Sequence, residues 1–157
     1  MEKVNFFARQ EMPHQRLDSA TVVRSTEGRL QMVMEAPVVV VYKQPENKTE
    51  CPQGVLLRFY NGRQVKTSIR ANYGISYDDR QYMELKKNVV IIDYQTGDTS
   101  YLHDLYWDGI EHRIYSHRPV RSVNGQRVTI GDAFESDEDF IAPVIVRQRG
   151  TILLNED

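Results

Sequence analysis

Three histidines and two aspartates lie close together in the sequence and are the residues best suited to hold a metal ion: His103, Asp104, Asp108, His112 and His117. Imidazole nitrogens and carboxylate oxygens are ordinary zinc ligands. The histidines follow one another as His-x8-His-x4-His, which differs from the His-Glu-x-x-His spacing of a helical zinc site. In an extended strand, neighbouring side chains point to opposite faces, so His103 and Asp104 would not converge. We therefore expect solvated strand positions, with no metal site and no enzymatic activity.

Two other features could carry chemistry. Glu135, Asp137, Glu138 and Asp139 form an acidic run. The run lacks the spaced oxygen ligands and the glycine of a calcium loop, so it is expected to be a charged loop. Cys51 is the only cysteine in the sequence, which excludes an internal disulfide and a multi-cysteine metal site. We expect no cofactor.

The bulk properties are those of one ordinary domain. A chain of 157 residues fits the usual domain length of about 100–200 residues. The formal net charge is -2, which argues against a nucleic-acid-binding domain, since such domains usually carry a basic surplus. These numbers leave the function open.

The sequence alternates between apolar and polar residues with the period of β-strands. From Gln64 to Asn72, the residues Val65, Thr67, Ile69 and Ala71 alternate with polar ones, which predicts a strand with one buried face. Similar alternation occurs at 29–36, 72–77, 113–115 and 127–130. Asn61-Gly62 and Asn124-Gly125 are hairpin signals, expected to form type I′ turns. The pattern predicts an all-β sandwich, jelly roll or barrel.

One phrase of the sequence is similar to a later one. "GISYDDRQYMELKKNVV" can be placed over "DLYWDGIEHRIYSHRPVR", so that Tyr77-Asp78 falls on Trp107-Asp108. The repeated unit would be a hairpin with a tight aspartate turn, and stacked hairpins make an elongated sheet. Chance similarity between β-hairpins is the alternative explanation.

Four stretches, read in order, resemble the LptC family, the periplasmic component of the lipopolysaccharide export machinery, in its Bacteroidetes-like form. "GRLQMVMEAPVVVVY" (28–42) resembles the opening strands of that family. "CPQGVLLRFYNGRQVKTSIRANYGISYDDRQYMELKKNVVI" (51–91) resembles its central signature. "LHDLYWDGIEHRIYSHRPVRS" (102–122) is similar to the next repeat, and "IGDAFESDEDF" (130–140) to the terminal motif.

The sequence departs from the family pattern at two positions. Cys51 stands where the family usually has an aromatic residue before proline. Ala133 replaces the second glycine of the terminal motif, which puts the shape of the terminal turn in question.

The resemblance implies an open, twisted β-jelly roll in which two antiparallel sheets face each other as a V. It implies a carrier that receives lipopolysaccharide from an inner-membrane ABC transporter complex and passes it to a periplasmic β-jelly-roll bridge protein. The acyl chains would lie in the interior and the sugars outside. Residues 1–20 would be an N-terminal segment following a membrane anchor or lipid-attachment signal that this chain lacks. Residues 21–157 would form the transport domain, in the periplasm and anchored to the inner membrane in the full-length protein.

The alternating pattern supplies an apolar face that could line a lipid groove, although the same residues would form the core of any β-sandwich. The groove candidates are Leu30, Met32, Met34, Val65, Ile69, Tyr73, Ile75, Tyr77, Leu105, Trp107, Ile114, Val128 and Ile130. The main alternative function is a carbohydrate-binding or structural β-sandwich of the cell envelope. A sugar-binding face would present exposed aromatic rings, and the single Trp weakens that alternative.

The end of the sequence contains two strand-like pieces, 141–147 and 151–154, separated by a turn. Pro143 lies within the first piece, and proline is tolerated in strands mainly at sheet edges. An unpaired edge can template strand addition from another chain, and the resemblance implies contact with the bridge protein here. The partner-edge candidates are Ile141, Val144, Ile145, Val146, Ile152 and Leu153.

Overall fold

The structure is a computed structural model that describes residues 13–148 and 150–153. Within these residues the chain is built almost wholly of antiparallel strands, as the alternation predicts, and no helix is long and apolar enough to span a membrane. The elements are β1 (Pro13–Thr26), β2 (Arg29–Tyr42), β3 (Lys48–Cys51), β4 (Val55–Asn61), β5 (Gln64–Ala71), β6 (Tyr73–Tyr77), the 3-10 turn η1 (Asp78–Arg80), β7 (Tyr82–Asp93), β8 (Thr99–Asp108), β9 (Arg113–Ser116), β10 (Val120–Asn124), β11 (Arg127–Gly131), β12 (Ala133–Asp137), β13 (Val144–Val146) and β14 (Thr151–Leu153).

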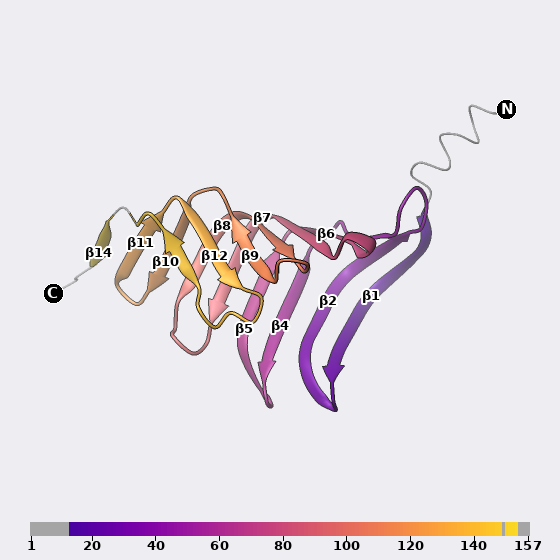
Figure 1. Ribbon diagram of the computed structural model, residues 1–157, viewed down its shortest axis with the longest axis horizontal. Coiled ribbons are helices and arrows are strands. Elements are labelled where there is room, and N and C mark those ends of the chain that lie inside the picture. The colour runs from indigo at the N-terminus through magenta and orange to yellow at the C-terminus, as the bar shows by residue number, and fades with distance from the viewer. Residues whose placement is uncertain (1–12, 149, 154–157) are drawn as a thin grey trace.

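The strands form two facing sheets that share their longest members. Sheet I consists of the first half of β2, then β4, β5, the second half of β7, the first half of β8, β10, β11 and β14. Sheet II consists of the second half of β2, then β3, β6, the first half of β7, the second half of β8, β9, β12 and β13. β1 pairs with β2 along its whole length and so belongs to both sheets. The strands follow one another along the long axis, with β1 near one end and β14 near the other (Figure 1). This is the open β-jelly roll that the family resemblance implies, and it is one of the all-β folds that the alternation predicts.

The chain passes between the sheets at a line of bends, which we call the apex. β1 bends at Ser19, whose φ is 56°. β7 bends at Lys87 and Asn88, which have φ values of 69° and 54° and interrupt the pairing with β8. Asn72, between β5 and β6, donates its N–H to the carbonyl of Lys87 at 2.9 Å. Because each bend is held by backbone geometry or hydrogen bonds, the sheets keep their V arrangement.

The hairpins turn at the two rims of the V. Two-residue loops Gly62-Arg63 and Gly125-Gln126 join β4 to β5 and β10 to β11 at the rim of sheet I. In each loop only the glycine has a positive φ, 67° and 60° respectively, which fits a type II′ turn. The hairpins are confirmed, but the type I′ assignment is wrong because each asparagine is the last strand residue.

The repeated phrase in the sequence corresponds to a repeated path of the chain. β6 ends at Tyr77, immediately before Asp78, and β8 ends with Trp107-Asp108, and both turns lie at the rim of sheet II. The chain thus returns to the same rim after crossing sheet I and turning there. Residue 20, where we expected the N-terminal segment to end, lies inside β1.

The core fills the inside of the V close to the apex. Its largest fully enclosed apolar side chains are Ile69, Val89 and Val120, each at most 2% exposed. Burial of this kind is the main source of fold stability. Further toward the rims, the inside of the V widens into a groove.

Candidate functional site

The N-terminal half of the groove holds a cavity of about 460 Å³, which we call the apolar chamber. Sheet I contributes Met32, Leu57 and Ile69, and sheet II faces them across the cavity. Polar side chains also line this cavity, among them Arg24 and Thr26 on β1 and His112 and Glu138 toward the rim of sheet II. The sheet II side chains of the floor are Met83, Leu85, Leu105, Trp107 and Ile114. An apolar floor with a polar rim suits a ligand with a hydrocarbon portion.

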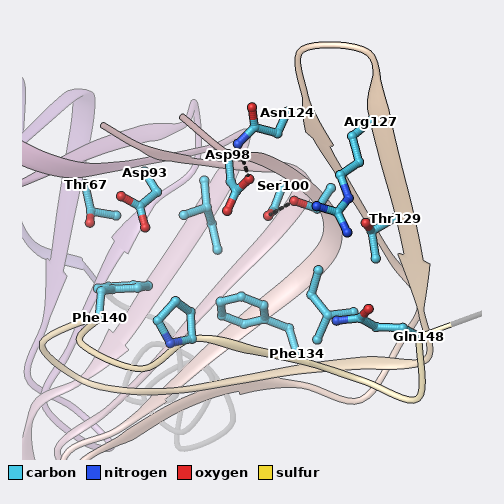
Figure 2. Close-up of a pocket in the computed structure, with 14 residues that line it drawn as sticks. Thr67, Asp93, Asp98, Ser100, Asn124, Arg127, Thr129, Phe134, Phe140 and Gln148 are labelled. Carbon is cyan, nitrogen blue, oxygen red and sulfur yellow. Dashed lines mark hydrogen bonds between the residues drawn. The ribbon is translucent and has the colours of Figure 1, made fainter. Parts of the chain in front are cut away.

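The C-terminal half holds a second cavity of about 460 Å³, which we call the polar chamber (Figure 2). The interior side chains of sheet I change from apolar to polar between the two chambers, although the strands stay in register. One cross-strand row runs through Met34, Leu57, Ile69, Ile91, Ser100, Ser122 and Thr129. The first four members are apolar, and the last three carry hydroxyl groups. The groove is therefore lined by two different surfaces.

A loop after β12 crosses the mouth of the groove at the boundary between the chambers. We call this loop, residues 138–142, the strap. The Asp137 carboxylate holds it by accepting hydrogen bonds from the N–H groups of Asp139, Ile141 and Ala142 at 2.9–3.2 Å. Burial acts to raise the pKa of Asp137, but these hydrogen bonds outweigh it and leave the pKa below its ordinary value.

The strap reaches from sheet II to sheet I. Phe140 is only 6% exposed, and its ring lies 5.4 Å from that of Phe59 on β4. Lys66 on β5 donates from Nζ to the carbonyl of Asp139 at 2.7 Å. The strap therefore ties the two rims together, which no pattern in the sequence predicts.

Glu138 fixes the strap to the apolar chamber. Its carboxylate accepts a hydrogen bond from Trp107 Nε1 at 2.9 Å, and His112 Nδ1 lies 2.8 Å from its other oxygen. Burial acts to raise the pKa of Glu138, but the bonds from Trp107 and His112 outweigh it and lower the pKa. The expected loop is thus only half right: Glu135 and Asp137 belong to β12, and Glu138 and Asp139 lie in the strap. Asp137 and Glu138 also have structural partners.

The structure places six of the thirteen groove candidates inside the V. They are Met32, Met34, Ile69, Leu105, Trp107 and Ile114, all of which pack in or against the core. The other seven face the outside of the sheets, and for them the predicted orientation is wrong. They are Leu30, Val65, Tyr73, Ile75, Tyr77, Val128 and Ile130.

Two of these errors come from bulges near the rim of sheet I. An extra residue, Gln31, shifts the register between β1 and β2, so Leu30 pairs with Ser25 and lies on the face opposite Met32. An extra residue at Lys66 has the same effect on Val65, which pairs with Tyr60 on the outer face. A bulge reverses the face of every residue beyond it, because the side-chain period of a strand is two.

Three errors come from the bend at Asn72. Ala71 faces the core, and two residues later alternation would place Tyr73 there as well. Instead it is Gly74 that faces inward, since a Cβ there would touch the side chains of Leu85 and Val55. Ile75 and Tyr77 share the outer face with Tyr73.

The last two errors come from the polar chamber. Thr129 on β11 lines the cavity, so its neighbours Val128 and Ile130 face outward. The prediction assumed that the apolar face of each strand is the inner one, and at this end of the molecule the inner face is polar.

Several lining residues were missed by sequence reasoning. Leu57 and Phe59 alternate with Val55 along β4 and could have been found from that pattern. Ser100 and Ser122 carry no apolar signal, although both are buried. Phe140 lies in a loop, where alternation gives no information.

The five residues considered as metal ligands have separate roles. His112 pairs with Glu138 as described, and the ring of His117 lies tilted against that of Tyr115, with centroids 4.9 Å apart. His103 lines a concave surface outside the apex. Asp108 caps its own turn. Among the described residues, no group of three His, Cys, Asp or Glu side chains is placed to hold a metal ion.

Asp104 is buried at the apex and has a structural role. Its carboxylate accepts hydrogen bonds from Ser116 Oγ at 2.6 Å and Tyr106 OH at 3.1 Å, and Arg118 lies 3.9 Å away. Cys51 is also buried. Burial, together with the nearby Glu50 carboxylate, raises the pKa of its thiol to about 11, so it is a poor nucleophile at neutral pH.

Treatment with a chelator should leave the melting temperature unchanged, because the dispersed His and Asp residues give a metal ion no common site. The measurement is a thermal melt followed by far-ultraviolet circular dichroism, with and without excess chelator. A clear drop that is reversed by adding zinc would show that a metal site does exist.

The outer face of sheet II carries a row of stacked rings, which we call the tyrosine ladder: Tyr77, Tyr82, Tyr106 and Tyr115, with centroids 5.6–6.3 Å apart. Arg80 covers the ring of Tyr77 at one end, and Arg113 covers that of Tyr115 at the other. A sugar stacks on an open aromatic face, and these faces are covered by neighbouring rings or guanidinium groups. The ladder is therefore a poor sugar platform.

The C-terminal end of each sheet is a short strand that pairs on one side only within the described residues. β13 pairs with β12, and β14, which contains Ile152 and Leu153, pairs with β11. The expected strand over 141–147 is shorter: Ile141 lies in the strap and is 79% exposed, and β13 spans Val144–Val146. Ile145 packs against the core.

Comparison with known proteins agrees with this geometry. No curated protein matches the sequence. The family model described as "Lipopolysaccharide-assembly, LptC-related" matches residues 10–137, which is most of the chain and includes β1 to β12. The chain therefore belongs to the LptC-related family, whose general role is in lipopolysaccharide transport.

Proposed function

We propose that this protein is a periplasmic carrier, anchored to the inner membrane in its full-length form. It receives lipopolysaccharide from an inner-membrane ABC transporter complex and passes it to a β-jelly-roll bridge protein. Family membership supports the general role. The observation that carries the proposal is the apolar chamber, an accessible cavity of about 460 Å³ between the facing sheets.

The apolar chamber can hold an acyl chain by the hydrophobic effect alone. Each methylene group moved from water into such a site contributes ~0.8 kcal/mol, so burying about six of them contributes about 5 kcal/mol. Met32 and Met83 add flexible thioether side chains, which adapt to chains of different shape. Binding would be firm but reversible, as a carrier requires.

Both ends of the V present strand edges to a neighbouring protein. Within the described residues β1 pairs only with β2, and its side chains are almost all exposed. At the other end β13 and β14 each have one unpaired side. Strand addition at β13 or β14 would continue the corresponding sheet into a bridge protein, and the groove with it.

A photo-reactive amino acid will test whether lipid enters the groove. Trp107 on β8 and Tyr82 on β7 lie close together in sheet II, but Trp107 lines the apolar chamber, whereas the ring of Tyr82 belongs to the tyrosine ladder and does not line it. We expect benzoyl-phenylalanine at Trp107 to crosslink to lipopolysaccharide and the same group at Tyr82 to crosslink weakly. Both positions hold aromatic residues, so the pair is matched in size. Equal labelling at the two positions would contradict the carrier proposal.

A further inference from the structure

The concave surface outside the apex encloses about 1130 Å³. It is lined where β7, β8 and the loop between β9 and β10 pass from one sheet to the other. Consecutive polar side chains lie on the outside at these crossings: Lys86, Lys87 and Asn88 on β7, and His103 and Asp104 on β8. The apolar residues that flank them on the same strands belong to the core. The bends therefore bring together on one face side chains that regular alternation would divide between two faces.

The charges of this surface are mostly positive, although the whole chain has a net charge of -2. Four cationic side chains line it, against the single carboxylate of Asp104: Lys86, Lys87, Arg118 and Arg121. Lys86 already has a partner, because its Nζ lies 3.2 Å from the Glu84 carboxylate. Within the described residues, Lys87 and Arg121 form no ion pair with a carboxylate. The surface thus presents positive charge to which an anion can bind.

The two arginines of this surface are held in position. The guanidinium of Arg121 lies over the ring of Tyr101, 4.7 Å from its centroid, and the two residues are direct neighbours on β10 and β8. Arg118 lies 3.9 Å from the carboxylate of Asp104, which is buried and accepts a hydrogen bond from Ser116 Oγ. A side chain that is already positioned loses less conformational freedom when it binds a ligand.

The floor of the surface is apolar. Val89, Leu102 and Val120 line it, and they are direct neighbours across β7, β8 and β10. An apolar floor beside cationic side chains suits a ligand that has both an anionic group and an apolar portion. Because β8 is paired on both sides at Leu102, no open strand edge is present there for a peptide to join. The surface therefore suits a small amphipathic anion better than an added strand.

A phosphate monoester matches these features. It carries a charge of about −1.5 to −2 at neutral pH, and its oxygens can accept two parallel hydrogen bonds from one guanidinium. We propose that this surface, which we call the apex site, binds a phosphate monoester. Lys87, Arg118 and Arg121 hold the phosphate, and the organic part lies against the apolar floor. The apex site lies outside the groove, so the proposal goes beyond the carrier function and does not depend on it.

A titration of the intact chain with hexyl phosphate, followed by the NMR signals of the backbone amides, will locate the site. We expect the amide signals of Lys87, His103 and Arg121 to shift. Inorganic phosphate should shift the same signals at higher concentration, because it does not cover the apolar floor. Hexanoate has a similar hydrocarbon part but only a single charge, and we expect it to bind ~10-fold more weakly.

A charge-removing variant tests the role of the arginines. Arg121→Gln should weaken the binding of hexyl phosphate ~10-fold, which corresponds to the loss of about one charge-assisted hydrogen bond. Arg63→Gln is the matched control, because Arg63 is an exposed arginine in the β4–β5 loop at the rim of sheet I. Equal weakening by the two variants would overturn the apex site. Binding of hexanoate as tight as that of hexyl phosphate would overturn the assignment to phosphate.

Vesicles distinguish the two sources of a phosphate monoester. Flotation of the protein with phosphatidylcholine vesicles that contain phosphatidic acid, and its loss in Arg121→Gln, would identify a lipid head group as the ligand. Binding of hexyl phosphate without flotation would identify a soluble ester. Absence of hexyl phosphate shifts at the apex residues would overturn the site and leave the carrier function standing, since the crosslink at Trp107 tests that function separately.

Discussion

Replacing Phe140 with alanine should destabilise the protein by about 3 kcal/mol, the lower part of the range for Phe→Ala substitutions in a core. The ring is 6% exposed, packs on Phe59 and supports the strap. Phe140 has a φ of 56°, and alanine suffers a similar backbone penalty there, so the loss reports packing rather than backbone strain. The measurement is urea unfolding, with a fall in melting temperature of about 10 °C as the corresponding thermal result.

The neighbouring residue supplies the control for this prediction. Ile141 is also in the strap but is 79% exposed, so Ile141→Ala should change stability by less than about 0.5 kcal/mol. Phe140→Leu keeps much of the buried volume and should cost less than about 1.5 kcal/mol. If Phe140→Ala and Ile141→Ala had equal small effects, the strap would not be packed on sheet I in solution.

Deleting residues 144–157 should weaken capture of the bridge protein by ~100-fold or more. The deletion removes β13 and β14, the open edges at the C-terminal end of each sheet. A few backbone hydrogen bonds at about 1 kcal/mol each account for a loss of this size. A pull-down with purified bridge protein measures it, and lipid crosslinking at Trp107 should survive because the apolar chamber contains no residue beyond Asp139.

Point variants distinguish backbone pairing at the β13 edge from side-chain packing of the same strand. Ile145→Pro removes a backbone N–H from β13, whereas Ile145→Ala loses the same side-chain contacts and keeps the N–H. Val144→Thr changes a side chain that is 53% exposed and should have little effect on capture. If Ile145→Pro strongly reduces capture of the bridge protein and the other two variants do not, the result supports strand pairing. Capture of the bridge protein by the truncated chain at unchanged affinity would place the contact surface elsewhere.

The all-β fold follows from features that the sequence shows directly, whereas the V arrangement was implied only by the family resemblance. Alternation identified β5 and β11, and glycine after asparagine located two hairpins. The family resemblance supplied the pairing of sheets, which local patterns do not contain. Strand existence is a local property, and for that reason these predictions succeed.

The face of the sheet on which a side chain lies was harder to predict, because single residues at bulges and bends decide it. One extra residue at Gln31 or Lys66, or one bend at Asn72, reverses the faces beyond it. None of these residues is of a type that marks a bulge or a bend. Leu105 and Trp107 were placed correctly because β8 is regular between them.

The polar chamber and the strap could not be predicted for a different reason. Burial of Ser100 and Ser122 depends on what faces them from sheet II, which is a long-range property. Phe140 is brought to Phe59 across the groove from a position far away in the sequence. Such contacts arise only when the whole chain has folded.

Because β1, β2, β7 and β8 run through both sheets, the V is a single hydrogen-bonded sheet folded along a crease. Its two wings cannot drift apart as independent bodies, and any change in groove width must be a rotation about that crease. Within the part of the chain that the structure describes, side-chain and carbonyl contacts around Phe140 and Lys66 join the wings at the far side. Continuous strands thus hold one side of the groove at the crease, and the contacts of the strap hold the other side. Because these strap contacts are not part of the strand pairing, losing them would leave the ladder hydrogen bonds of both wings intact.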